Sequence, residues 1–320
     1  MYFIGIDGGG TKTAIYSVNT EDYKLHRIET SGSSWRETGI PSLAQMLKNA
    51  VNDLTAGGKI GGIAMGLPCY GESIEGDRLL NQMIKDIFPG ICVYLTNDVE
   101  VGWAGSLALR PGINVIAGTG SITFGKDSSG KTERSGGWSE FFGDEGSCYW
   151  IGRKLMEIFS KQSDGRLPKD ELYTIVKQEF KLENDFDFID IVHSDYINNR
   201  KEAASLQLIA KKAAMAGSVS AKALYDEAAD ELLLMVNAVR GKLDFNDEPW
   251  AVSYSGGLFK SGEFVLPRFS GEIEKAGGVV LKPQFKPVQG ALLLALQHFN
   301  PDELNKIIKI MEKNNESDLH

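Results

Sequence analysis

Residues that could bind phosphate stand close to the start of the chain, in the motif DGGGT. Gly8, Gly9 and Gly10 carry no Cβ, so their backbone N–H groups can approach an anion closely and cradle it. The Thr11 hydroxyl adds a donor, and Asp7 supplies a hard oxygen ligand that can hold magnesium directly or through water. An ordinary glycine-rich hairpin is the alternative for so short a motif. A Walker loop is not indicated, because GxxxxGK[ST] is absent and the chain returns as a strand.

A second loop of the same kind occurs later in the chain, again between two strand-like runs. It consists of Gly118, Thr119, Gly120 and Ser121. Two copies of one phosphate-loop hairpin indicate duplicated α/β domains that face each other across a cleft. Because the pair is more specific than either loop alone, we favour a two-loop phosphate clamp over an accidental second hairpin.

A carboxylate suited to proton transfer follows the strand predicted at residues 91–95. Strands that alternate with helices predict a partly parallel sheet, whose ligand sites lie at the carboxyl ends of its strands. Asp98 falls at such an end and could take the proton of an attacking hydroxyl. Phosphoryl transfer then needs little else from the protein than alignment and stabilisation of the phosphate charge.

Two further loops combine glycine with groups that could contact a ligand. In residues 136–150, Trp138 could stack on the apolar face of a sugar ring, while Asp144 and Glu145 could accept hydroxyl protons. An aromatic plug in the core, with Asp144 as a helix N-cap, is an equal alternative. The turn at Gly256 and Gly257 follows a predicted strand and could lie against adenosine or lead into a helix.

Apolar periodicity predicts the elements that position these loops. We expect strands over residues 2–6, 14–18, 24–29, 60–66, 91–95, 114–117, 122–125, 250–254 and 279–281. We expect helices over 41–54, 77–88, 99–107, 148–160, 168–180, 201–216, 218–239, 289–298 and 301–312. The more polar segment 161–199 is interpreted as an inserted subdomain.

Composition restricts the class of protein. A chain of 320 residues with 42% hydrophobic side chains suits one large or two medium globular domains. The net charge of -9 and the absence of a basic run make nucleic acid and anionic membranes poor candidate partners. Three cysteines without a CxxC pair signal neither a disulfide framework nor a zinc site. The sequence shows no leader pattern and no apolar run long enough for a bilayer, so we expect a cytoplasmic protein.

Taken together, the motifs resemble those of the sugar-kinase branch of the actin-like ATPases, the N-acetylglucosamine kinases and BadF/BadG/BcrA/BcrD-type ATPases. The matching segments are DGGGTKT at 7–13, TND at 96–98, GTGS at 118–121, GGW and GDEGS within 136–147, and SGG at 255–257. The match covers most of the chain and is weakest over 161–199.

This resemblance implies an actin-like ATPase (ribonuclease H-like) fold of two duplicated α/β domains, with ATP and Mg²⁺ in the cleft between them. The first domain would span residues 1–117 and be completed by a C-terminal helix at 300–320. The second would span 118–299 and carry a helical insertion near 161–240. A homodimer is implied by the same resemblance.

The resemblance also implies roles for individual residues. Asp7 would lie near magnesium, and Asp98 would be the catalytic base. The residues implied to bind the nucleotide are Gly8, Gly9, Gly10, Thr11, Lys12, Gly118, Thr119, Gly120, Ser121, Gly256 and Gly257. Those implied to bind the sugar are Ser33, Ser34, Asp98, Gly137, Trp138 and Asp144. Two departures leave contacts open: an asparagine usually occupies the loop that holds Ser33 and Ser34 here, and Lys212 replaces a small residue in the adenosine-facing region.

The predicted function is ATP-dependent phosphorylation of an amino sugar, with N-acetylglucosamine at its 6-hydroxyl as first choice and N-acetylmuramate as a further acceptor. Glucosamine is the nearest rival substrate. An ATPase activator that drives electrons through an iron–sulfur cluster is an alternative of another class, but Cys69, Cys92 and Cys148 lack the spacing for a cluster. A sugar-sensing regulator is the third alternative.

Overall fold

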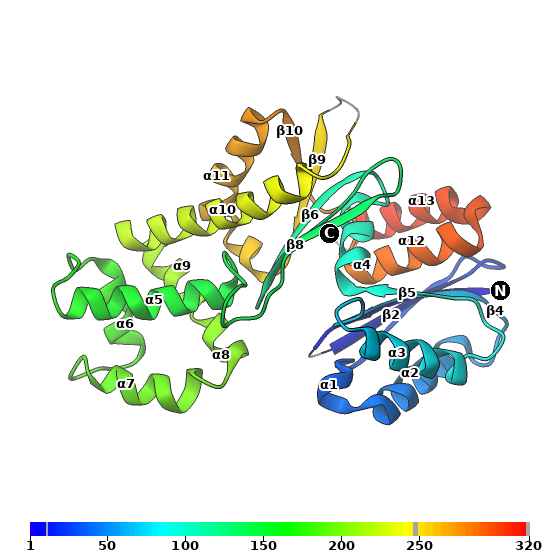
Figure 1. Ribbon diagram of the computed structural model, residues 1–320, viewed down its shortest axis with the longest axis horizontal. Helices are drawn as coiled ribbons and strands as arrows, with labels where there is room; N and C mark the ends of the chain where they lie inside the picture. Colours follow the sequence, from blue (N-terminus) through cyan, green and yellow to red (C-terminus); the bar gives the residue numbers. More distant parts are fainter. Residues whose placement is uncertain (11, 246–248, 318–320) are drawn as a thin grey trace. The chain divides into compact units, whose positions relative to one another are not determined.

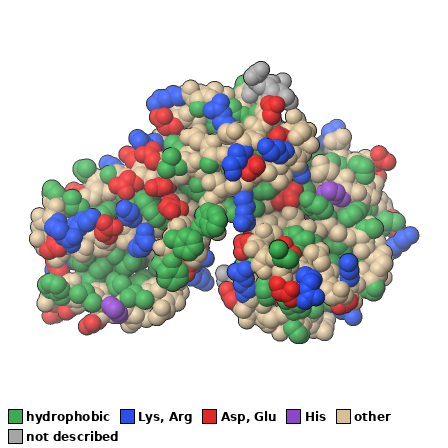
Figure 2. Space-filling view, viewed as in Figure 1, with side chains coloured by type: hydrophobic (Ala, Val, Ile, Leu, Met, Phe, Trp, Pro, Cys, Tyr) green, Lys and Arg blue, Asp and Glu red, His purple; other side chains and the backbone are tan. Residues whose placement is uncertain are grey.

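The computed structural model describes residues 1–10, 12–245 and 249–317, with side chains to residue 314. The chain divides into two compact units (Figure 1). The first unit joins Met1–Arg110 to Pro283–His320, and the second is Pro111–Lys282. Acidic and basic side chains are interspersed over the visible face of each unit (Figure 2). None of the described helices is long and apolar enough to cross a membrane.

The sheet of the first unit has the strand order β3-β2-β1-β4-β5. Its strands are β1 (Tyr2–Gly8), β2 (Lys12–Asn19), β3 (Leu25–Ser31), β4 (Ile60–Leu67) and β5 (Val93–Asn97). The first three strands pair antiparallel, whereas β1, β4 and β5 pair parallel. The carboxyl ends of these three parallel strands therefore meet at one edge of the sheet.

Helices cover both faces of this sheet. The side chains of one strand can pack against helices on both sides, because successive side chains alternate between the two faces. The helices are α1 (Trp35–Thr38), α2 (Ile40–Thr55), α3 (Ile74–Ile87), α4 (Asp98–Leu107), α12 (Pro287–Phe299) and α13 (Pro301–Ser317). Ile4 and Ile6 of β1 pack in the core cluster that includes α2 and α3. Phe3, from the other face of the same strand, packs in the cluster formed with α12 and α13.

The sheet of the second unit repeats this arrangement, with the order β8-β7-β6-β9-β10. Its strands are β6 (Gly112–Ala117), β7 (Ser121–Lys126), β8 (Thr132–Gly136), β9 (Trp250–Ser255) and β10 (Gly278–Leu281). Again the first three strands along the chain pair antiparallel and the later two add in parallel. The predicted duplicated α/β architecture is thus confirmed.

The helices of the second unit lie between β8 and β9 and between β9 and β10 in the sequence. They are α5 (Cys148–Ser163), α6 (Glu171–Glu179), α7 (Asp187–Ile191), η1 (Val192–Tyr196), α8 (Arg200–Ser205), α9 (Gln207–Met215), α10 (Val219–Arg240), η2 (Gly257–Ser261) and α11 (Gly262–Lys275). Helices α5 to α9 extend to one side of the sheet (Figure 1). One hydrophobic core joins them to α10, α11 and the sheet.

The two units differ from the expected domains in their boundaries. The division falls after Arg110 instead of residue 117, and α12, assigned from sequence to the second domain, belongs to the first unit. The reason is close packing: a Cβ built on Gly290 of α12 would lie 2.2 Å from the backbone nitrogen of Gly105 in α4. Predicted helix 201–216 is two helices, α8 and α9, and β8 and α11 were not predicted.

Candidate active site

Strand pairing in the first unit brings the two predicted acidic residues to the same edge of the sheet. Asp7, next to the end of β1, pairs with Gly66 of β4, which pairs with Thr96 of β5. Asp98 follows β5 directly and is the first residue of α4. The N-cap residue Asn97 accepts a hydrogen bond from the Val99 amide at 3.1 Å. The Asp98 carboxyl group therefore lies at the positive end of a helix.

Both acidic residues are partly buried, which makes the charge of their carboxyl groups costly. Burial, and then the charge of Asp98, raise the pKa of Asp7 to about 7, although Lys12 opposes the shift. Burial, and then the charge of Glu72, raise the pKa of Asp98 to about 6, against hydrogen bonds from the Asp98 and Val99 amides. Carboxylates at neighbouring strand ends repel one another, and a divalent cation between them would offset that repulsion.

The acidic side chains at this sheet edge would not complete a metal site by themselves. Among the described residues no group of three or more His, Cys, Asp or Glu side chains could hold a metal ion. Magnesium commonly takes only one or two protein carboxylates and completes its shell with water and substrate phosphates. Asp7 could therefore hold such an ion, but only together with ligands that come from outside the protein.

The first glycine loop is a tight turn whose backbone is fixed by its neighbours. The Gly9 amide donates to the Lys12 carbonyl at 3.0 Å, and the Gly9 carbonyl accepts from the Ser33 amide at 2.9 Å. A Cβ on Gly8 would lie 2.3 Å from the Ser33 hydroxyl, whereas no described residue beyond its chain neighbours comes within 4 Å of one on Gly10. The loop is thus closed behind Gly8 and open at Gly10, as a phosphate cradle requires. Thr11 lies outside the described residues.

Ser33, Ser34 and Lys12, predicted for ligand binding, lie near this loop in the sequence, whereas Lys212 belongs to the second unit. Ser33 is fully buried, with its hydroxyl behind Gly8, and Ser34 is 8% exposed. Lys12 is exposed and forms an ion pair with Glu29 at 3.3 Å. In the second unit, Lys212 of α9 is exposed and pairs with Glu179. Sequence indicated the positions of these side chains along the chain but not their burial.

The second glycine loop joins β6 to β7 and is also cross-braced. The Gly118 amide donates to the Gly120 carbonyl at 2.9 Å, and the Gly118 carbonyl accepts from the Cys148 amide at 2.9 Å. The third glycine turn packs directly on it, since a Cβ on Gly256 would lie 2.3 Å from the Ala117 carbonyl oxygen. Gly256 also has φ +106°, which favours glycine. Thr119, between these contacts, is exposed.

The loop at residues 136–147 contacts the second glycine loop at Ser121. The Gly137 amide donates to the Ser121 carbonyl at 2.9 Å. The buried Asp144 carboxylate accepts from the Ser121 amide at 3.2 Å and forms an ion pair with Arg200. Asp144 is not the cap of α5, because the Ser147 hydroxyl accepts from the Trp150 amide. Arg200 was missed from sequence, since nothing local marks an arginine at the start of a short helix in the least typical segment.

Aromatic side chains of this loop are open to solvent. Trp138 is 65% exposed, and Phe141 and Phe142 are more exposed still. The indole face of Trp138 is thus available to stack on a sugar ring. By contrast Asp144 is only 3% exposed, so its carboxylate serves the loop itself in this structure.

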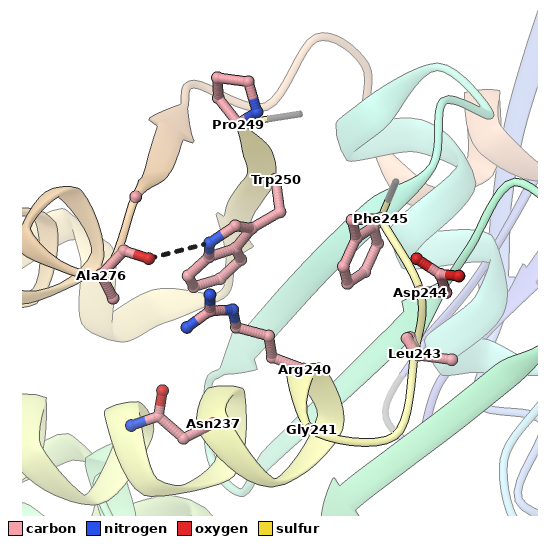
Figure 3. A pocket seen from close by; sticks show the side chains of 10 residues that line it. Asn237, Arg240, Gly241, Leu243, Asp244, Phe245, Pro249, Trp250 and Ala276 are labelled. Carbon is pink, nitrogen blue, oxygen red and sulfur yellow. Dashed lines mark hydrogen bonds between the residues drawn. The ribbon is translucent and has the colours of Figure 1, made fainter. Parts of the chain in front are cut away.

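A pocket of about 720 Å³ lies elsewhere in the second unit (Figure 3). Its lining includes Pro249 and Trp250 at the beginning of β9, and the Arg240 guanidinium lies 4.6 Å from the Trp250 ring centroid. Gly256 follows the other end of that strand. The pocket is therefore separate from the glycine loops.

Comparison with known proteins identifies the family of this chain. The model of the BadF/BadG/BcrA/BcrD ATPase family matches residues 4–295. An N-acetylmuramic acid/N-acetylglucosamine kinase of Clostridium acetobutylicum is 32% identical over 84% of this chain and 89% of its own length. An N-acetyl-D-glucosamine kinase of Dictyostelium discoideum is 28% identical over 92% of this chain and 97% of its own length. Both relatives are sugar kinases by name.

Solved structures show the same fold. A candidate N-acetylglucosamine kinase of Chromobacterium violaceum superposes with a TM-score of 0.72 at 24% identity, over 92% of this chain and 98% of that chain. A ROK family glucokinase of Streptomyces griseus, solved with glucose and AMPPNP, gives a TM-score of 0.54 at 16% identity, over 91% and 97% of the two chains. The predicted actin-like ATPase fold and family resemblance are thus confirmed. The chain belongs to the BadF/BadG/BcrA/BcrD ATPase family.

Proposed function

We propose that this protein is an ATP-dependent amino-sugar kinase that phosphorylates the 6-hydroxyl of N-acetylglucosamine and also accepts N-acetylmuramate. The observation that carries the proposal is the placement of Asp7, the open side of its glycine loop and Asp98 along one sheet edge. The two curated relatives support the substrate class by their names.

Asp98 is the proposed general base. Its pKa of about 6 makes it more basic than an ordinary aspartate while leaving it mostly ionised near neutral pH. It would accept the proton of the sugar hydroxyl as the oxygen attacks the γ-phosphorus of ATP. The attacking oxygen bonds to phosphorus, the bond to the β-phosphate oxygen breaks, and ADP leaves with that electron pair.

The two glycine loops would hold the phosphates. Gly8, Gly9 and Gly10 would act in the first unit, together with Thr11 and Lys12, and Gly118 to Ser121 in the second. The Gly9, Gly118 and Ser121 amides already donate within the protein, so these three would shape the loops, and contact with phosphate would come from the other groups. When bound at Asp7, Mg²⁺ supplies positive charge to the phosphate oxygens. Gly256 and Gly257 are proposed to face the adenosine, and Gly137 and Trp138 the sugar.

Ser33 and Ser34 could reach a sugar only if their loop opens, because both are buried. We therefore keep them as proposed sugar contacts of an opened loop. Asp144 likewise would have to share its carboxylate between the sugar and Arg200.

The test is ATP-dependent ADP release, with product mass, over a panel of N-acetylglucosamine, N-acetylmuramate, glucosamine, N-acetylmannosamine and glucose. The two N-acetylated sugars with a 6-phosphorylated product are expected to react best. A preference for glucosamine would contradict the substrate assignment and leave the kinase mechanism standing. ATP hydrolysis that no sugar stimulates would contradict the kinase. Sedimentation of the purified protein tests the homodimer that the family resemblance implies.

A further inference from the structure

One ion pair lies directly against the second glycine loop. The Asp144 side chain is 4% exposed and its Oδ2 accepts from the Nη2 of Arg200, whose side chain is 41% exposed. The other oxygen, Oδ1, accepts from the Ser121 amide at 3.2 Å. One carboxylate therefore connects the loop that begins β7 with the helix α8.

The second glycine loop packs directly against this ion pair, with no space between them. A Cβ on Gly120 would lie 2.5 Å from Arg200 Nη2 and 2.7 Å from Asp144 Oδ1. Any side chain at residue 120 would displace the guanidinium or the carboxylate. Gly120 is thus packed on one side by a cation and an anion, and its position depends on both.

The position of Arg200 is in turn set by its helix. The Asn199 side chain accepts from the Glu202 amide at 3.2 Å and caps α8. A Cβ on Gly152 of α5 would lie 2.1 Å from the Ala203 carbonyl oxygen, so α8 packs closely on α5. Arg200 therefore extends from a helix that is capped at its N-terminus and packed closely on α5.

The role of Arg200 follows from the carboxylates that surround its guanidinium group. Without it, a buried carboxylate would remain unpaired next to a loop proposed to bind phosphate, and like charges repel strongly in such a place. Arg200 also approaches Glu140, with Nε 3.5 Å from Oε2. One guanidinium faces two carboxylates, so the charge of Arg200 is already compensated within this cluster and is not in surplus for a phosphate.

We propose that Arg200 is a positioning residue of the second phosphate loop, which neutralises Asp144 so that the loop accepts a nucleotide. The inference rests on the proposed nucleotide binding at Gly118 to Ser121. It also gives the helical segment that contains α8 a role in nucleotide affinity.

The test is calorimetric titration of the whole protein with magnesium and AMPPNP. Arg200→Ala should raise Kd about tenfold or more, because the unpaired Asp144 charge then opposes the phosphates. The double variant Arg200→Ala/Asp144→Asn should return Kd to within about threefold of the original, since both charges are gone. Arg200→Lys, which keeps the charge, should stay within a similar range.

The matched control is Arg268→Ala, which breaks an arginine–aspartate pair with Asp230 in the same unit, at 2.6 and 2.8 Å. It should leave Kd unchanged. An unchanged Kd in Arg200→Ala would overturn the inference, and so would a double variant as weak as the single one. If Arg200→Ala does not fold, Arg200→Gln, which removes the charge but keeps a hydrogen-bond donor, takes its place; it should raise Kd by a similar factor, and an unchanged Kd would overturn the inference. Failure of the unmodified protein to bind AMPPNP would instead refute the proposed function.

Discussion

Replacing Asp98 by asparagine separates the catalytic role of this carboxylate from its effect on stability. Asparagine keeps the size and can still lie at the start of α4, but it cannot accept a proton. General-base catalysis contributes about 10²-fold or more, so we expect turnover in Asp98→Asn to fall by about that factor. The sugar KM should change little. Steady-state assays of ADP release measure both quantities.

The same substitution should stabilise the protein free of metal and nucleotide. The pKa of Asp98 rises from 3.8 to about 6 on folding, so the unfolded chain loses this proton at lower pH. Ionisation of Asp98 therefore favours the unfolded state, with no cost below pH 3.8 and the full cost above about pH 6. The difference in pKa corresponds to about 3 kcal/mol at pH 7.5 and to about 1.5 kcal/mol at pH 5.

Urea unfolding in EDTA at these two pH values measures the effect. The free energy of unfolding of Asp98→Asn should exceed that of the original protein by about 1.5 kcal/mol more at pH 7.5 than at pH 5. Asp86→Asn, at an exposed position of α3, is the control and should show no such gain. A gain in stability independent of pH, or none at pH 7.5, would refute the assignment of a desolvated charge at Asp98. Unchanged turnover would refute its role as the base.

Two further predictions concern packing and thiol chemistry. Gly290→Ala should destabilise the protein by about 2 kcal/mol or more, because its Cβ would meet backbone atoms of α4, whereas Gly271→Ala in α11, with nothing within 4 Å, should stabilise it by about 0.5 kcal/mol. Equal effects in thermal unfolding would contradict the packing of α12. Exposed Cys92 should react first with a thiol reagent at pH 8, while burial raises the pKa of the Cys148 thiol to about 11 and slows it. Rapid labelling that persists in Cys92→Ser would disprove this order.

Much of the fold was predictable because its signals are local. The hairpin of β1 and β2 follows from apolar alternation on either side of three glycines, and α10 begins where a serine, Ser218, can cap it. β8 was missed because its sequence TERSG is polar and ends in glycine, as suits an edge strand. α11 was missed because Pro267 and Gly271 interrupt its helical pattern.

The candidate site was less accessible to sequence because it depends on contacts between distant residues. A strand end identifies Asp98, but nothing local indicates that Ser33 is buried behind Gly8. The partner of Asp144 is 56 residues away, on a helix that its own pattern does not mark as functional. Periodicity likewise shows that α12 is apolar without showing which sheet it covers.

The discontinuity of the first unit has a consequence for synthesis on the ribosome. Unit two is a single stretch, Pro111–Lys282, so its whole sequence emerges before α12 does. β1 cannot be covered on one face until then, since a Cβ on Gly5 would lie 2.1 Å from the Leu292 backbone nitrogen and the two segments are in close contact. The strand made first therefore waits for a helix made nearly last, and the nascent chain must keep an apolar sheet face from aggregation during that interval.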